Sequence, residues 1–396
     1  MGRSFDDIPV RLDRLERRSM YRRRRIVESA QGAELTVDGR RLLNFCSNDY
    51  LGLANDARIR EAFRQGVDRW GVGAGASHLV CGHTAVHHQL EEALAQMTGR
   101  PRALFFSSGY AANLGVINAL VGTRDHVFED RLNHASLLDG GWISRAAFEW
   151  YEHGCVDDLE VRLTRVADEP GRRLVVSDGV FSMDGDRCPL ADLASAAERH
   201  DAWLMIDDAH GFGVIGKTGI GSVDPDVFAT AQVPVLMATL GKAVGTSGAF
   251  VAGDDSLIEF LIQRARNYIY TTALPAAVAA ATLESLRIVM SEHWRREKLA
   301  ELITHFRRGV HSLDIDLLPS QTPIQPIVIG DATAALAASR ALETLGFLVT
   351  AIRPPTVPRG TSRLRVTLTA AHTTEAVDRL IAALGTVLGR TRNASE

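Results

Sequence analysis

The residue best suited to covalent chemistry in this sequence is a lysine that follows an apolar run. Lys242 comes after Val235–Ala238, directly behind Gly241. Lysine is rarely buried without a partner, and forming an imine would remove its charge. The pattern therefore indicates a strand end whose lysine is suited to Schiff-base chemistry. Taken alone, the same residue could equally be a surface lysine in a glycine loop.

A carboxylate and an imidazole follow the preceding apolar run. Asp207 ends the run Trp203–Ile206, and His210 lies three residues further on. A buried carboxylate needs a partner, and the protonated ring nitrogen of a cofactor would serve. His210 could then reach an oxygen on the same ring. Each residue alone could be structural, but the nearby Lys242 favours the chemical interpretation.

An anion site is predicted between another apolar run and a helix. Ser107-Ser108-Gly109-Tyr110 separates Ala103–Phe106 from the helix expected over Tyr110–Val121. The first N–H groups of a helix, together with its dipole, suit a phosphate. Thr239 could add a hydroxyl group. Any phosphorylated ligand would fit such a site.

Strands and helices must alternate to position these residues. Apolar runs predict strands at Ala103–Phe106, His126–Phe128, Arg173–Ser177, Trp203–Ile206, Val235–Ala238 and Gly248–Ala252. Helical periods lie between them, at Tyr110–Val121, Asp157–Asp168 and Leu190–His200. This alternation predicts an α/β fold with a mainly parallel, doubly wound sheet. Ligands bind beyond the carboxyl ends of such strands, so these ends, including Asp178–Ser182, should share one pocket.

Three segments are expected along the chain. Residues 1–50 form an N-terminal segment with an arginine-rich helix and a strand pair at Glu34–Val37 and Arg41–Phe45. Residues 51–285 form the large domain. Residues 286–396 form a small α+β domain, which a helical tract over Pro275–Leu313 leads into. Its expected elements are Ile324–Ile329, Thr333–Leu345, Phe347–Ile352, Arg363–Leu368 and Thr374–Leu388.

Two other patterns suggest binding sites but lack the required context. Gly71–Ala76 matches a nucleotide-binding G-x-G-x-x-A pattern, but a helix rather than a strand is expected over Arg60–Trp70. A histidine-rich group fits no familiar zinc spacing, and no carboxylate or cysteine pair completes it in the sequence. Its members are His78, Cys81, His83, His87 and His88. We therefore expect no metal site.

Composition narrows the class of protein. The 396 residues are 46% hydrophobic and 23% charged, as in a globular protein, and the net charge of −4 argues against a nucleic-acid partner. Four scattered cysteines suggest a reducing compartment rather than a disulfide framework. The sequence contains no apolar run long enough to cross a membrane. A cytoplasmic location is expected.

The combination of motifs resembles a known family. Asp207-x-Ala209-His210-Gly211, followed by Thr239-x-Gly241-Lys242, resembles the fold-type I pyridoxal-phosphate (PLP) enzymes and, more narrowly, the α-oxoamine synthases. Similar segments occur in the same order through most of the chain. They are Asn44–Leu53, Gly71–Gly75, Asn133–Ser136 and Val180–Gly185. One stretch, Ala76–Leu79, differs from the sequence that many family members have at this position.

The resemblance implies pyridoxal 5′-phosphate as cofactor, with roles for particular residues. Lys242 would form the Schiff base, Asp207 would pair with the ring nitrogen, and His134 would stack on the ring. Asp207, His134, His210 and Lys242 would be the catalytic residues. The remaining implied cofactor contacts are Ser182 at the ring oxygen, where His210 also lies, and Gly109, Tyr110 and Thr239 at the phosphate.

The resemblance also implies the substrates. Ala351–Pro358 and Arg363–His372 are most similar to members that join L-alanine to pimeloyl-CoA or a pimeloyl-carrier protein in biotin synthesis. Arg365 would bind the amino-acid carboxylate near Asn48. Arg22 and Thr356 would contact the acyl substrate, and His134 would also contact substrate. A homodimer with a shared active site is expected, in which Thr271 and Thr272 of one subunit approach the other's phosphate.

Other functions remain open from the sequence. A sister synthase could use glycine or serine with another acyl-CoA, and an aminotransferase could share the fold. A non-catalytic scaffold subunit would be expected to lack Lys242. A nucleotide-binding oxidoreductase rests only on the glycine pattern.

Overall fold

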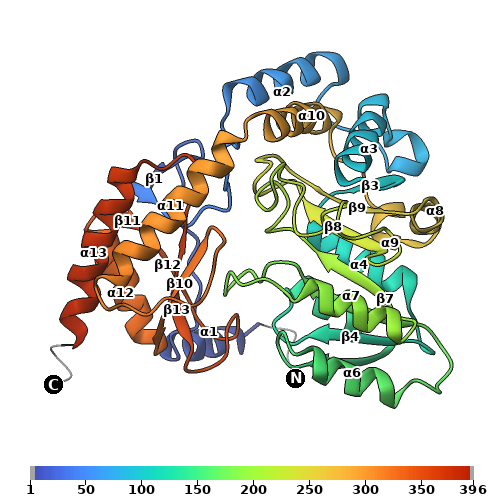
Figure 1. Ribbon diagram of the computed structural model, residues 1–396. Helices are drawn as coiled ribbons and strands as arrows, with labels where there is room; N and C mark the ends of the chain where they lie inside the picture. Colours follow the sequence, from blue (N-terminus) through green and yellow to red (C-terminus); the bar gives the residue numbers. More distant parts are fainter. Residues whose placement is uncertain (1–4, 393–396) are drawn as a thin grey trace. The chain divides into compact units, whose positions relative to one another are not determined.

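The computed structural model describes residues 5–392 and divides into two compact units (Figure 1). The large unit comprises Asp49–Ser182 and Asp186–Glu297. The small unit comprises the chain up to Asn48, the short segment Met183–Gly185, and the chain from Lys298 onward. Each unit is described by itself, and the predicted boundaries at residues 50 and 285 stay a prediction.

The large unit contains a seven-stranded sheet in the order β3-β9-β8-β7-β6-β4-β5. The strands are β3 (Arg102–Phe106), β4 (His126–Asp130), β5 (Ala147–Tyr151), β6 (Arg173–Asp178), β7 (Trp203–Asp207), β8 (Val235–Thr239) and β9 (Ala249–Gly253). Among these described strands only β9 runs antiparallel to its neighbours. The predicted doubly wound, mainly parallel sheet is confirmed.

The helices of the large unit are α2 (Ala57–Trp70), the π-helix η1 (His78–Gly82), α3 (Ala85–Thr98), α4 (Gly109–Leu120), α5 (Ala135–Ile143), α6 (Val156–Arg165), α7 (Leu190–Arg199), α8 (Asp255–Arg264), α9 (Arg266–Ile269) and α10 (Ala276–Ser291). Helices α4, α8 and α9 pack on one face of the sheet, and α6 and α7 pack on the other. Helix α11 (Trp294–His311) begins in this unit. No helix in the part of the chain described here is long and apolar enough to span a membrane.

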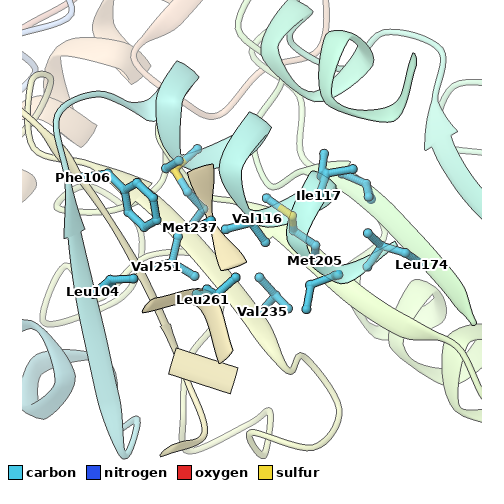
Figure 2. Packing of buried hydrophobic residues seen from close by; sticks show 14 of the residues in the cluster. Leu104, Phe106, Val116, Ile117, Leu174, Met205, Val235, Met237, Val251 and Leu261 are labelled. Atoms are coloured by element: carbon cyan, nitrogen blue, oxygen red, sulfur yellow. The ribbon is translucent and has the colours of Figure 1, made fainter. Parts of the chain in front are cut away.

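The strands alternate their side chains between two apolar cores. Met205, Val235 and Met237 pack with α4 on one face, and Figure 2 shows Val116 of α4 between Met205 and Met237. Leu204 and Leu236 pack on the other face, with residues of α6 and α7. Because both faces are buried, the strands read as continuous apolar runs. This is why their positions could be predicted.

The small unit contains two three-stranded sheets, ordered β1-β2-β11 and β10-β13-β12. Its elements are α1 (Ile8–Arg17), β1 (Glu34–Val37), β2 (Arg40–Asn44), β10 (Ile324–Gly330), α12 (Ala332–Thr344), β11 (Phe347–Leu348), β12 (Thr350–Ile352), β13 (Ser362–Thr367) and α13 (Thr374–Arg392). Strand β11 pairs in parallel with β2, so a C-terminal segment completes the N-terminal sheet.

Three expectations about elements were wrong. The strand β5 was missed, because this edge strand is mostly exposed or half-buried and lacks an apolar run. The expected helix Pro275–Leu313 is two helices, α10 and α11, which Glu292 and His293 separate. The expected strand Phe347–Ile352 is split between β11 and β12, which belong to different sheets.

A tight turn fixes the segment that follows Lys242. The N–H of Gly245 donates to the carbonyl of Lys242 at 2.9 Å, and Gly245 has a φ of +71°. A Cβ at this position would lie 2.5 Å from the backbone nitrogen of Ala54 and 2.6 Å from the carbonyl carbon of Leu53. Only glycine therefore fits this turn without moving the lysine segment.

We expect Gly245→Ala to lower the free energy of unfolding by at least about 2 kcal/mol, because left-handed backbone strain and a backbone overlap add together. Chemical denaturation of the variant and the parent measures the change. Gly122→Ala is the matched control, since Gly122 is a loop glycine with open space around the added methyl group. Equal losses in the two variants would show that the turn is not constrained.

Candidate active site

The polar strand ends of the large unit lie at one edge of its sheet. Strands β3, β8, β7 and β6 share a direction because β9 is reversed relative to both of its neighbours. Asp178 and Asp207 end adjacent strands in register with each other. The parallel pairing thus places the predicted residues Gly109, Asp207, Thr239 and Lys242 at or just beyond the same edge.

Lys242 lies in a short chain of polar contacts at this edge. Its Nζ is 2.8 Å from Nε2 of His210, and Nδ1 of His210 is 2.6 Å from the hydroxyl of Tyr50. Tyr50 is fully buried and His210 is 5% exposed, so the imidazole is held on both sides. A neutral imidazole has one donor and one acceptor nitrogen. The His210 tautomer is therefore coupled to the protonation of the lysine amine.

Asp207 is 3% exposed and its two carboxylate oxygens accept different hydrogen bonds. Oδ1 accepts the N–H of Ala209 at 2.9 Å, and Oδ2 accepts Nδ2 of Asn113 at 2.7 Å. The same Asn113 amide group donates to Ser136 Oγ at 2.8 Å. Ser136 Oγ in turn lies 2.7 Å from Nδ1 of His134. Two predicted residues, Asp207 and His134, are thus connected through a buried amide and a hydroxyl.

His134 is anchored at the start of α5. Its backbone N–H donates to Oδ2 of Asp178 at 2.6 Å, and its Nδ1 accepts the N–H of Ser136 at 3.3 Å. Removal from bulk water by the surrounding protein lowers the pKa of His134, and the positive charge of Lys242 lowers it further. The ring is consequently neutral near pH 7. A neutral, solvent-facing imidazole suits stacking on an aromatic ligand.

Buried acids surround this network. Asp178 is 2% exposed, and burial together with the charge of Asp207 raises its pKa well above the ordinary value. Burial raises the pKa of Asp208 to about 7, although its Oδ2 accepts the N–H of Ser222. The Asp207 carboxylate, which Ala209 and Asn113 hold in place, is the natural partner for a cationic group at this edge.

The start of α4 has the geometry of an anion site. Ser108 caps this helix by accepting the N–H of Ala111 at 3.2 Å. The first N–H groups of a helix, here those of Gly109 and Tyr110, have no acceptor within it. The Thr239 hydroxyl differs from the expectation, because it donates to the carbonyl of Gly248 at 3.1 Å. A ligand that uses Thr239 must therefore share its hydroxyl oxygen.

Four of the five predicted substrate residues, all except His134, belong to the small unit and form two contacts inside it. Both terminal nitrogens of Arg365 lie 3.2 Å from Oδ1 of Asn48, and Nη1 also donates to Thr367 at 3.0 Å. Nη2 of Arg22 donates to the hydroxyl of Thr356 at 3.3 Å. In the small unit these four residues thus lie in two pairs, Arg365 with Asn48 and Arg22 with Thr356.

The individual arginines of the run Arg22–Arg25 have different partners within the small unit. Arg23 pairs with Glu16, and Arg25 pairs with both Asp38 and Glu343. Arg22 instead contacts a neutral hydroxyl. Its positive charge is thus the better suited of these three to an anionic substrate.

Sequence reasoning missed three residues of the site: Tyr50, Asn113 and Ser136. Tyr50 and Ser136 lie inside the segments Asn44–Leu53 and Asn133–Ser136, which carry the family resemblance. Asn113 lies four residues after Gly109, on the same face of α4. That spacing is the signal that could have identified it. Ser182 lies half-buried in the segment that follows β6, as expected.

These groups fit pyridoxal phosphate. A lysine amine is held against an imidazole, a buried carboxylate lies nearby, and a capped helix start can receive a phosphate. Asn113 Oδ1 is buried without a hydrogen-bond partner among the described residues, so the network retains an acceptor. The glycine pattern at Gly71–Ala76 follows helix α2 rather than a strand, which confirms that the nucleotide-binding context is missing.

Known proteins are similar over nearly the whole chain. A family model described as aminotransferase class I and II matches residues 40–384. An 8-amino-7-oxononanoate synthase from Nitrosococcus oceani is 60% identical over 379 residues, covering 96% of this chain and 100% of that protein.

Two solved structures are also similar. A serine palmitoyltransferase from S. paucimobilis with a bound PLP–myriocin aldimine is 29% identical, covers 98% of each chain and has a TM-score of 0.91. An 8-amino-7-oxononanoate synthase from Francisella tularensis is 30% identical, with 89% of this chain and 99% of that chain covered and a TM-score of 0.76. These matches confirm the expected fold-type I class. The chain therefore belongs to the class I and II aminotransferase family and, within it, to the 8-amino-7-oxononanoate synthases.

Proposed function

We propose that this chain condenses L-alanine with a pimeloyl thioester to give 8-amino-7-oxononanoate, CO₂ and free thiol, a step of biotin synthesis. The observation that carries the proposal is the 2.8 Å contact between Lys242 Nζ and His210 Nε2, at the sheet edge that also holds Asp207. The name of the relative at 60% identity supports the choice of substrates. Pyridoxal phosphate, when bound, supplies the electron sink for a carbanion at the amino-acid α-carbon.

Lys242 has two tasks in this proposal. Its amine would hold the cofactor, and the same Nζ, when free, would remove the α-proton of alanine. The contact with His210, which Tyr50 fixes from the opposite side, orients the amine. An amine positioned in this way removes a proton more effectively than one that rotates freely.

Asp207, His134 and the start of α4 bind the cofactor in this proposal. The Asp207 carboxylate keeps a proton on the ring nitrogen, and Asn113 and Ala209 hold the carboxylate in place. The neutral His134 ring provides a flat surface for stacking. His210 and Ser182 approach the ring oxygen, while Gly109, Tyr110 and Thr239 receive the phosphate.

Arg365 and Arg22 bind the two substrates. Arg365 is 7% exposed, and it contacts the side chains of Asn48 and Thr367. A planar guanidinium in that setting suits the carboxylate of alanine. The exposed Arg22 and Thr356 contact the acyl substrate, whose pimeloyl group ends in a second carboxylate. The acyl donor is pimeloyl-CoA or a pimeloyl-carrier protein.

The proposal includes a homodimer in the cytoplasm. In this dimer Thr271 and Thr272, of which Thr272 pairs with Ser77 of its own chain, approach the phosphate of the partner subunit. The four cysteines are free thiols, which supports a reducing compartment.

Borohydride reduction of the cofactor-loaded protein should label Lys242. The whole chain has only three lysines, Lys217, Lys242 and Lys298, so peptide mapping identifies the labelled residue directly. We expect Lys242→Ala to bind cofactor without a reducible imine and to lose turnover by at least about 1000-fold. Exposed Lys217→Ala is the matched control and should behave as the parent. Label or activity retained in Lys242→Ala would contradict the assignment.

Asp207→Asn should still bind the cofactor but should lower the rate at which the α-proton of alanine is removed. The amide can keep the Ala209 contact, and a rotated Asn113 side chain can present its unpartnered oxygen to the new NH₂ group. Losing the buried negative charge removes on the order of 3 kcal/mol of transition-state stabilisation, or about 100-fold in rate. Exchange of the alanine α-proton in D₂O measures this loss. Parental exchange rates in a fully loaded variant would refute the role of Asp207.

A further inference from the structure

The histidine-rich segment of the large unit is completed by a carboxylate that the sequence pattern did not identify. His83, His88 and Glu91 each place one ligand atom within 4.8 Å of the others. Nε2 of His83 lies 3.9 Å from Oε2 of Glu91. The expectation that no carboxylate completes this group is therefore wrong. Two imidazole nitrogens and one carboxylate oxygen are typical ligands of zinc and similar ions.

The start of helix α3 sets this arrangement. His88 and Glu91 are three residues apart on α3 and share one face of it, while His83 precedes the N-cap residue Thr84. His87 takes no part, because its Nδ1 accepts the N–H of Thr84 at 3.1 Å and its Nε2 lies 2.8 Å from the carbonyl of Leu274. His87 is thus held by contacts within the cap and with Leu274, and His83, His88 and Glu91 form the group.

Two of the three ligands are oriented by a second contact. Glu91 Oε1 accepts the N–H of Phe105 on edge strand β3 at 2.9 Å, which leaves Oε2 directed to His83. Nδ1 of His83 lies 2.9 Å from Nδ1 of His78. If His83 donates this hydrogen bond, its Nε2 carries the lone pair that binds a metal. Contacts of this kind fix ligand tautomers and orientations in metal sites.

The ligands open onto a cavity of about 270 Å³. His78, His83, His88, Glu91 and Glu92 all line it. Glu92 adds negative charge, since its Oε1 lies 3.5 Å from His88 Nε2. Arg102 also lines the cavity and opposes a cation, but its guanidinium lies 3.2 Å from Glu259 and 3.9 Å from Asp255. The remaining charge around the ligands favours a cation.

We propose that His83, His88 and Glu91 bind one divalent transition-metal ion, with water completing the coordination. Bonds of about 2.1 Å place tetrahedral ligand atoms about 3.4 Å apart, so the exposed His88 and half-buried His83 need only small side-chain rotations. The ion links the segment between η1 and α3 to α3 itself, and Glu91 extends this link to strand β3. The site is structural and does not depend on the proposed reaction.

Equilibrium dialysis of the EDTA-treated holoenzyme against Zn²⁺ tests the site. We expect one tightly bound Zn²⁺ per chain in the parent. His88→Gln and Glu91→Gln should each weaken this binding by at least about 100-fold, and Gln at position 91 can still accept the Phe105 N–H. Zn²⁺ should also raise the melting temperature of the parent but not of these variants.

Two matched controls address chance binding. His305→Gln removes another imidazole that contacts a carboxylate, Asp378, at 2.6 Å, where the described residues offer no third ligand. Cys81→Ser removes the exposed thiol in η1. Both should bind Zn²⁺ as the parent does. Parental binding by His88→Gln and Glu91→Gln, loss of binding in either control, or no binding by the parent would overturn the proposal.

Discussion

Compensation of buried negative charge is the constraint on which the large unit's site depends. Glu129, Asp178, Asp207 and Asp208 all lie buried at or near the carboxyl ends of adjacent strands. Charges this close in a low-dielectric interior cannot all be ionised. Burial accordingly raises the pKa of Glu129 to about 8 and that of Asp208 to about 7, and burial together with the charge of Asp207 raises the pKa of Asp178 well above its ordinary value. Among these acids, Asp207 is held by hydrogen bonds from Ala209 and Asn113 and is suited to pair with a cationic ring.

The second feature of the site is the fixed position of the lysine. Gly245 closes the turn after Lys242 in a space that admits no Cβ, and His210 contacts the amine. Tyr50 holds His210 from its other nitrogen. Lys242 is thus positioned by the turn that Gly245 closes and by the contact of its amine with the His210 imidazole. The backbone that crowds Gly245 and the tyrosine that holds His210 both come from the distant segment Tyr50–Ala54, which explains why the lysine alone was ambiguous.

Much of the fold could be predicted because its strands are buried on both faces. Strands β6, β7 and β8 read as continuous apolar runs, and their polar ends revealed the shared edge. The edge strand β5 carries no such run and was missed. Tyr50 and Glu91 were missed for another reason: their contacts with His210 and with the N–H of Phe105 are tertiary, and sequence spacing does not reveal them.

The substrate pair is the central claim, and free-thiol release measures it most directly. The cofactor-loaded protein would be given alanine, glycine or serine with pimeloyl-CoA, a pimeloyl-carrier protein, or shorter and longer acyl-CoAs. The account predicts release with alanine and a pimeloyl thioester, together with formation of 8-amino-7-oxononanoate. Faster release with glycine or serine and another acyl-CoA, or no release with any pair, would contradict it.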